Sequence, residues 1–167
     1  MKLRFLLFSF LIVSTAFGQN TADDYIRSGN QKEKVNDYKG ALMDYQKAYE
    51  MDPANTEALY STGYMKFLMQ DYMSAITDFD NAIKSDTESV ELFYARGNAN
   101  FEMKNYSAAI IDYNHAIFLD STDKESYYNR AIAKYNSGQR ESACKDLLMA
   151  KKYGDPLAEE TWKELCR

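Results

Sequence analysis

Apolar residues recur at steps of three and four positions from about residue 22 onward, which is the spacing that gathers side chains on one face of an α-helix. Between residues 90 and 119, Phe93 and Phe101 belong to one such run, and Ile110 and Ile117 belong to a second. The polar pair Lys104-Asn105 separates the two runs. The pattern predicts a helix over about 90–103, a short turn, and an antiparallel helix over about 106–119.

This helical pattern repeats with a period of 34 residues. Small residues occupy three columns of the repeat: Gly29, Gly63, Gly97 and Ala131; Ala41, Ala75, Ala109 and Ala143; Ala48, Ala82, Ala116 and Ala150. Two helices that cross closely admit only glycine or alanine at the crossing, while neighbouring positions carry larger side chains. The repeat therefore predicts four helix pairs within residues 22–155, at 22–55, 56–89, 90–123 and 124–155.

In these features the sequence resembles the tetratricopeptide repeat (TPR) family, whose unit is also 34 residues long. The family has a large residue at position 4 of the unit, where this chain has Tyr25, Leu59, Phe93 and Tyr127. It usually has an aromatic residue at position 11, where this chain has Lys32, Lys66, Asn100 and Lys134, with the aromatic residue one place later in the last three units. The resemblance implies an all-α, right-handed α-solenoid of four helix pairs.

A further amphipathic helix is predicted after the fourth pair, over residues 156–167. Gly154 suits the end of the preceding helix, Asp155 is a helix-capping residue, and Pro156 suits a first helical position. Leu157 and Trp162 are among its apolar residues. We expect this helix to cover the exposed end of the array, as the terminal element of a repeat protein must.

The two cysteines, Cys144 and Cys166, lie at similar distances on either side of the turn at Gly154. In an antiparallel hairpin they come to similar heights, so a disulfide is predicted, which an oxidising compartment would permit. The alternative is that Cys144 is a small core residue and Cys166 a free thiol in a frayed end.

The first eighteen residues have the three-part pattern of a cleaved secretory signal. Lys2 and Arg4 precede an apolar run over 5–13, and Ala16-Phe17-Gly18 supplies the small residues before a cleavage point at Gln19. A retained anchor is the alternative, although the run is shorter than a typical membrane span. The expected location is therefore the periplasm or the extracellular space. The segments 128–130 and 143–147 also resemble repeat proteins exported by bacteria of the Bacteroidota.

Composition and charge exclude several classes of function. The 25 acidic residues outnumber the 20 lysines and arginines, so the chain lacks the basic surplus of a nucleic-acid-binding protein. A content of 14 Tyr and 9 Phe argues against disorder. No phosphate-binding loop, metal-ligand spacing or catalytic triad is present. We therefore expect no enzyme activity, no cofactor and no metal site.

The single histidine is interpreted as a surface residue, and the repeated aspartates as structural residues. His115, the only histidine, is expected on the surface of a second helix. The repeated aspartates are expected to form hydrogen bonds or ion pairs near their own helix turns, because identical residues one repeat apart lie on successive helix pairs; they are Asp44, Asp78, Asp112 and Asp146.

The TPR resemblance implies that the first helices of the pairs line a groove, chiefly through positions 2, 5, 6, 9, 12 and 13. These positions predict a row of tyrosines with an acidic margin and two amides, which would bind a protein or peptide segment with basic and apolar residues. The candidate residues are Tyr60, Tyr94, Tyr128, Glu57, Glu91, Glu125, Asn30, Tyr64 and Asn98. Alternatively, the tyrosines at position 5 pack between adjacent first helices, and both roles can hold together.

The carboxylate clamp, a peptide-binding pattern of some TPR proteins, is not predicted here. In the first reading frame only Asn30 matches, and Glu91 stands where the pattern has lysine; the frame one repeat later fails almost completely. We therefore interpret the chain as an exported scaffold for protein–protein interaction. The alternatives are a structural subunit of an envelope assembly that uses the convex face or the ends, and a glycan- or peptidoglycan-binding module.

Overall fold

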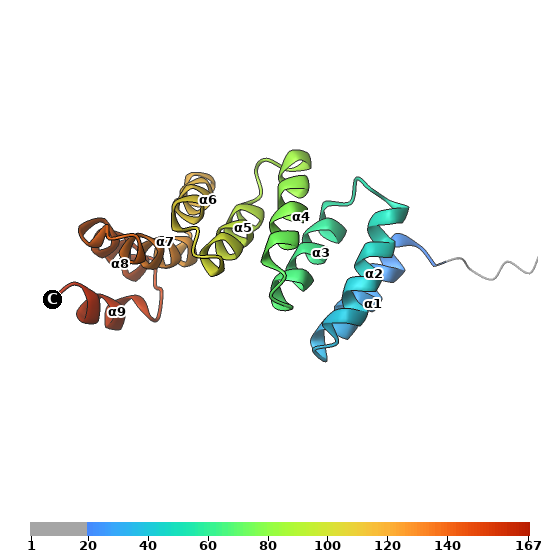
Figure 1. The fold of residues 1–167 in the computed structure, drawn as a ribbon, viewed down its shortest axis with the longest axis horizontal. Helices are drawn as coiled ribbons and strands as arrows, with labels where there is room; N and C mark the ends of the chain where they lie inside the picture. Colours follow the sequence, from blue (N-terminus) through green and yellow to red (C-terminus); the bar gives the residue numbers. More distant parts are fainter. Residues whose placement is uncertain (1–19) are drawn as a thin grey trace, which may run out of the picture.

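A computed structural model describes residues 20–167, which form nine α-helices and no strand (Figure 1). The predicted signal segment, 1–18, lies outside the described residues. The helices are α1 (Ala22–Lys34), α2 (Tyr38–Met51), α3 (Thr56–Leu68), α4 (Tyr72–Ser85), α5 (Val90–Glu102), α6 (Tyr106–Leu119), α7 (Lys124–Asn136), α8 (Arg140–Lys152) and α9 (Ala158–Leu165). The predicted all-α class is confirmed.

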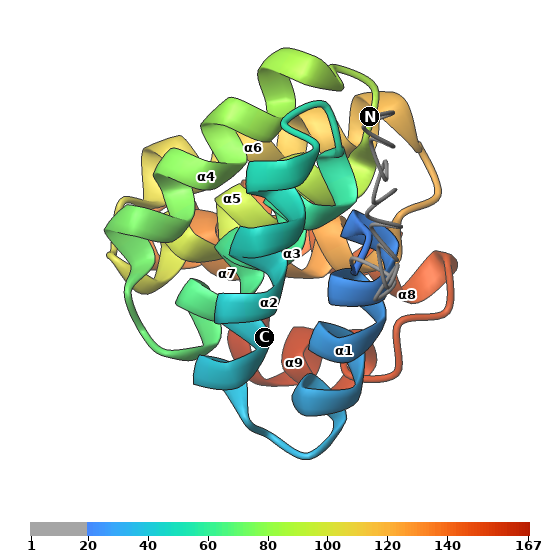
Figure 2. The same ribbon diagram turned by 90° about the vertical axis from the view of Figure 1, so that its right-hand side faces the viewer.

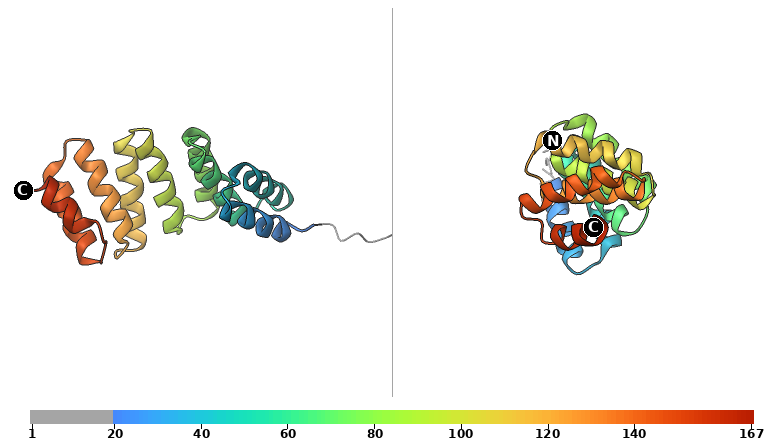
Figure 3. Two further views of the ribbon diagram at one scale, coloured as in Figure 1. Left: turned by 90° about the horizontal axis from the view of Figure 1, so that it is seen from below. Right: turned by 90° about the vertical axis from the view of Figure 1, so that its left-hand side faces the viewer.

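The helices pair in sequence order and follow one another along the molecule (Figures 1 and 3). Each helix contacts mainly the helix before it and the helix after it. A view from the α1–α2 end shows the later pairs behind the first (Figure 2). The architecture is therefore an α-solenoid of four pairs, in which α9 takes the place of the first helix of a fifth pair.

The turn inside each pair has one residue in the left-handed backbone conformation, at the same position of every repeat. These residues are Asn36, Gln70, Lys104 and Gly138, with φ of 60°, 64°, 61° and 85°. In the first pair the next residue, Asp37, donates its backbone N–H to the carbonyl of Lys32 at 2.9 Å, which satisfies an otherwise unpaired carbonyl at the end of α1. Equivalent bonds recur in the other three pairs, so the two helices meet with one turn geometry throughout.

The glycine column marks the closest helix contacts. A Cβ added at Gly97 would lie 2.8 Å from Cε1 of Tyr113, closer than real Cβ atoms approach a neighbour. Gly29 and Gly63 stand in the same relation to the rings of Tyr45 and Phe79. The fourth pair has alanine in this column, and it has Leu147 where the others have an aromatic ring. Glycine is therefore required where an aromatic ring fills the pair.

The repeated aspartates lie buried or half-buried between the two helices of each pair. Lys32 Nζ lies 2.5 Å from Asp44 Oδ2, and the corresponding distances are 2.6 Å for Lys66–Asp78 and 2.8 Å for Lys134–Asp146. In the third pair Asn100 Nδ2 donates to Asp112 at 3.1 Å. The structural interpretation is supported. Each partner lies on the other helix of the same pair, because position 11 faces that helix.

Burial and hydrogen bonding act in opposite directions on Asp44. Burial raises its pKa, but hydrogen bonds from Lys32 and Ser28 and the positive charge of Lys32 bring the net pKa below the usual range. Asp44 is therefore ionised at neutral pH, and lysine at position 11 is the counter-ion that the buried carboxylate needs.

Two arginines extend these ion pairs from one helix pair to the next. Arg96 Nη2 lies 2.6 Å from Asp112 Oδ1 in its own pair, and its Nη1 lies 2.6 Å from Asp80 Oδ1 in the preceding pair. Arg130 likewise contacts Asp146 at 2.7 Å and donates to Asn114 of the preceding pair at 2.7 Å. The second, third and fourth pairs are therefore connected by guanidinium groups as well as by apolar packing.

The cap helix α9 is attached to the fourth pair covalently. Cys144 and Cys166 form the predicted disulfide, with their Cα atoms 5.8 Å apart. The carboxylate of Asp155 accepts the backbone N–H groups of Leu157 and Ala158, both at 2.9 Å. The prediction that the helix begins at Pro156 was wrong. The chain makes a turn over 156–157 before the helix begins at Ala158. The Asp155 carboxylate stabilises this turn by accepting the N–H groups of Leu157 and Ala158.

Candidate functional site

Three hollows form a row along the first helices of the pairs. The first, of about 530 Å³, lies between α1 and α3, the second, of about 260 Å³, between α3 and α5, and the third, of about 440 Å³, between α5 and α7. Tyr64 lines the first and second hollows, while Phe67 and Asn98 line the second and third. Neighbouring hollows therefore share lining residues, and we call the three together the groove.

The tyrosines at position 5 line the groove and also pack between adjacent first helices. Tyr60 and Tyr94 line the second hollow and Tyr128 lines the third, and all three are half-buried. Tyr60 packs against a core cluster that contains Leu59 of its own helix and Leu92 of the next first helix. Burial raises the pKa of Tyr60 and of Tyr94, so both hydroxyls stay protonated near neutral pH. Each ring is thus fixed between helices with part of its surface open to the groove.

Tyr128 contacts the cap helix as well as the groove. Its hydroxyl lies 3.2 Å from Oγ1 of Thr161 on α9. The disulfide-bonded cap therefore helps to position the last tyrosine of the row.

Phe67 and Phe101 also line the groove and are absent from the predicted set. The ring of Tyr64 stacks between Tyr60 and Phe67, with centroid distances of 6.0 Å and 6.2 Å. The sequence feature that could have identified them is that their aromatic side chains stand at position 12 of the repeat, where the family usually has the aromatic residue at position 11. Position 11 faces the buried aspartate of the second helix, so the next residue, about 100° further round the helix, faces the groove.

The side-chain oxygens of the two predicted amides, Asn30 and Asn98, accept hydrogen bonds from other residues of this chain. Tyr45 donates its hydroxyl to Asn30 Oδ1 at 2.6 Å, and Tyr113 donates to Asn98 Oδ1 at 2.8 Å. Burial raises the pKa of Tyr113 well above its usual value, so this hydroxyl remains a donor. Asn98 lines the groove and Asn30 its first hollow, but each also satisfies a buried tyrosine.

Asn129 is a further groove residue that the sequence analysis did not single out. Its Nδ2 donates to Asn98 Oδ1 and to the hydroxyl of Tyr94, both at 3.0 Å. The side chains of α5, α6 and α7 are thereby joined in one hydrogen-bonded network.

The three predicted glutamates are exposed, each in the first turn of its helix, at one margin of the groove. Glu57 and Glu91 line a smaller hollow of about 210 Å³ together with Tyr60, whereas Glu125 lines none of these hollows. No lysine, arginine or histidine lines the hollows between α3, α5 and α7. This part of the groove therefore combines aromatic surface with negative charge.

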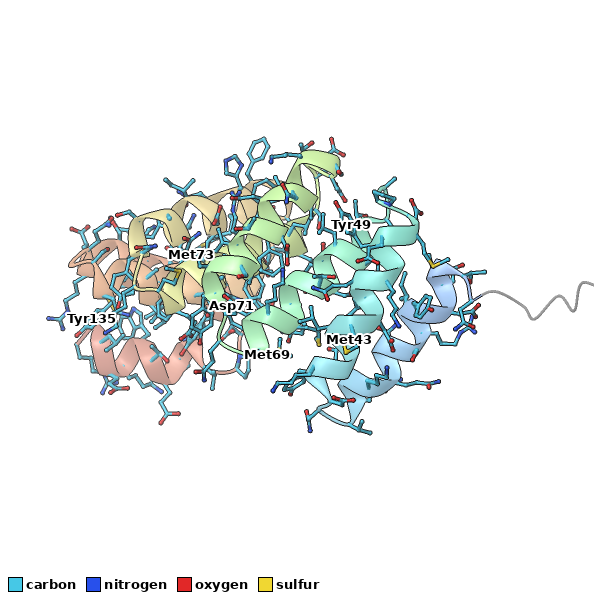
Figure 4. The ribbon with its side chains drawn as sticks, turned by 45° about the vertical axis from the view of Figure 1, so that its right-hand side comes forward. Met43, Tyr49, Met69, Asp71, Met73 and Tyr135 are labelled. Carbon is cyan, nitrogen blue, oxygen red and sulfur yellow. A yellow bond between two sulfur atoms is a disulfide. The ribbon has the colours of Figure 1, made fainter. Side chains whose placement is uncertain are left out.

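The opposite surface carries a different feature on α6. Phe118 is 84% exposed and Ile111 57%, and with Asn114 and His115 they line a hollow of about 400 Å³. His115 is exposed, as predicted, and its ring lies 4.9 Å from that of Phe93. Exposed methionines occur on the second helices as well, at Met43 of α2 and Met73 of α4 (Figure 4). We call Ile111, Asn114, His115 and Phe118 together the outer surface of α6.

Within residues 20–167, no helix combines the length and apolar character needed to cross a bilayer. The same range contains no group of three or more His, Cys, Asp or Glu residues arranged to hold a metal ion.

Comparisons with known proteins agree with the helix pairs. The family model of anaphase-promoting complex, cyclosome, subunit 3 matches residues 34–116. Among solved structures, one of the MamA protein is 26% identical with a TM-score of 0.75, over 86% of this chain and 83% of that one. No curated protein sequence matches.

Two other similar structures concern peptide binding. YrrB, described as a TPR protein with an unusual peptide-binding site, is 23% identical with a TM-score of 0.70, over 87% of this chain and 79% of that one. The first TPR of Spaghetti (RPAP3), bound to an HSP90 peptide, is 20% identical with a TM-score of 0.69, over 71% of this chain and 94% of that one. The chain has the TPR type of α-solenoid fold.

Proposed function

We propose that this protein is an exported TPR scaffold that binds a polypeptide segment along its groove and has no catalytic activity of its own. The row of adjoining hollows lined by half-buried tyrosines carries the proposal. Aromatic rings held by packing provide contact area at low entropic cost, and tyrosine adds a polar tip. The peptide-binding structures that share the fold add support.

The partner segment has basic and apolar residues. Lysine and arginine gain from carboxylates and from the faces of aromatic rings, and this groove offers both between α3 and α7. A strongly acidic segment would meet like charge along the margin formed by Glu57, Glu91 and Glu125.

Truncating a groove tyrosine is expected to weaken binding to a partner isolated with the mature chain as bait. Tyr60→Ala, Tyr94→Ala and Tyr128→Ala should each cost more than about 1 kcal/mol, or about fivefold in Kd, because each removes a ring fixed by packing. Titration calorimetry measures the affinities, and circular dichroism checks that each variant is folded.

Phe118→Ala is the matched control, since it removes an exposed ring outside the groove. It should bind like the parent. If the three tyrosine variants bind like the parent and Phe118→Ala does not, the interface is the outer surface of α6. That result favours a subunit of an envelope assembly over a groove-binding scaffold.

Export is part of the proposal and is tested separately. The intact mass of the protein from its native source should correspond to a chain that begins near Gln19, because the preceding residues have the signal pattern. Recovery of the full-length chain from the membrane fraction would contradict cleavage and favour a retained anchor.

A further inference from the structure

We propose that the third hollow, between α5 and α7, holds the guanidinium group of an arginine side chain from the partner segment. The inference rests on the proposed function and assigns one ligand group to one part of the groove. It is carried by the walls of the hollow, by the hydrogen bonds of Asn129 and by the charge of Glu102.

The walls suit a planar cation. Phe67, Phe101, Tyr128 and Ile132 line this hollow of about 440 Å³, which leaves room for a long side chain together with water. Guanidinium groups stack on aromatic faces and are less strongly hydrated than ammonium groups. The chain itself uses this contact elsewhere, since the guanidinium carbon of Arg130 lies 5.2 Å from the ring centroid of Tyr127.

The amide network determines which polar atoms remain for a ligand. Both hydrogens of Asn129 Nδ2 are used, one on Asn98 Oδ1 and one on the Tyr94 hydroxyl. Within residues 20–167, Asn129 Oδ1 has no hydrogen-bond partner, so Asn129 offers this hollow an acceptor only. An acceptor favours a ligand with N–H donors and disfavours a carboxylate.

Glu102 supplies the counter-charge. It lines the same hollow, is exposed, and has no ion-pair partner in the described part of the chain. A guanidinium presents several N–H donors in one plane and can donate to a carboxylate and to an amide oxygen together.

The other two hollows lack this combination. The first has Lys34 beside Glu33, so a cation of the chain is already present. The second has tyrosines, Phe67, Ala95 and Asn98 but no carboxylate in its lining. Of the three hollows in the groove, only the third joins aromatic walls, an acceptor and a carboxylate without a lining cation.

The test uses capped heptapeptides of serine and alanine whose central residue is arginine, citrulline, lysine or leucine. Citrulline has the planar shape of arginine without its charge. Each peptide is titrated into the ¹⁵N-labelled mature chain at millimolar concentrations, and NMR follows the side-chain amides of Asn98 and Asn129 and the backbone amide of Glu102. The arginine peptide should shift these signals, with an affinity at least about fivefold higher than that of the other three peptides.

Glu102→Gln should reduce the preference for arginine over citrulline to about twofold or less. Glu88→Gln is the matched control, because it makes the same charge change at an exposed loop residue outside the groove and should leave the preference unchanged. An equal loss in both variants would mean that net charge alone is sensed, which overturns the assignment.

Three other results would also overturn it: absence of shifts at Asn98 and Asn129, equal affinity for arginine and citrulline, and equal affinity for arginine and lysine. None of these decides the proposed function, because the tyrosine variants test the groove with its own partner. A groove that needs Tyr94 but does not distinguish arginine from citrulline would keep the function and reject the arginine site.

Discussion

Replacing Asp112 with alanine is expected to lower the free energy of unfolding by about 3–5 kcal/mol. The carboxylate is 3% exposed and accepts hydrogen bonds from Arg96 and from Asn100 Nδ2. Its removal leaves a partly buried guanidinium without its main counter-ion and a buried amide without an acceptor. Urea denaturation followed by circular dichroism measures the loss.

The control is Asp80→Ala, which removes the other carboxylate that contacts Arg96. That side chain is 47% exposed, and exposed ion pairs contribute up to about 1 kcal/mol. Similar losses in the two variants would show that burial of the carboxylate is not what makes the Asp112 interaction strong. A loss below about 1 kcal/mol for Asp112→Ala would contradict the role assigned to the repeated aspartates.

Breaking the disulfide between Cys144 and Cys166, whose sequence separation is 22, is expected to cost about 3 kcal/mol, as the chain-entropy model gives for a closed loop of this length. The loss should begin at α9, which covers Tyr127, Leu147 and Ala150 of the fourth pair. Helices α1 to α6 should change little, because each helix of the solenoid contacts mainly its neighbours. Hydrogen exchange read by mass spectrometry, with and without reductant, measures where protection is lost.

Cys144→Ser/Cys166→Ser provides the same comparison without reductant. A uniform loss of protection over all four pairs would contradict the local effect. Free-thiol titration that finds both cysteines reactive in the natively purified protein would contradict the disulfide itself. Because Tyr128 contacts Thr161 of α9, reduction should also change the last part of the groove before it changes the first.

The 34-residue period was sufficient to predict the fold from sequence. A helix face is defined by steps of three and four residues, and a small residue at a constant place in each unit defines where two helices cross. The predicted helices 90–103 and 106–119 therefore agree with α5 and α6 to within one residue. The same argument places Tyr60, Tyr94 and Tyr128 on one side of the array, where the structure has them lining the groove.

The hydrogen-bond partners depended on the tertiary structure. Periodicity gives the direction of a side chain from its own helix, but not the distance or the chemistry of what faces it from the next helix. The hydrogen bond between Asn98 and Asn129 requires α5 and α7 to lie side by side, where the Tyr113 hydroxyl also donates to Asn98. The contact between Asp112 and Arg96 likewise requires α5 and α6 to pair. The sequence by itself determined the repeat, the helices and the aromatic face. The tertiary structure decided which polar groups are already satisfied within the chain and which remain for a ligand, because that depends on contacts between helices.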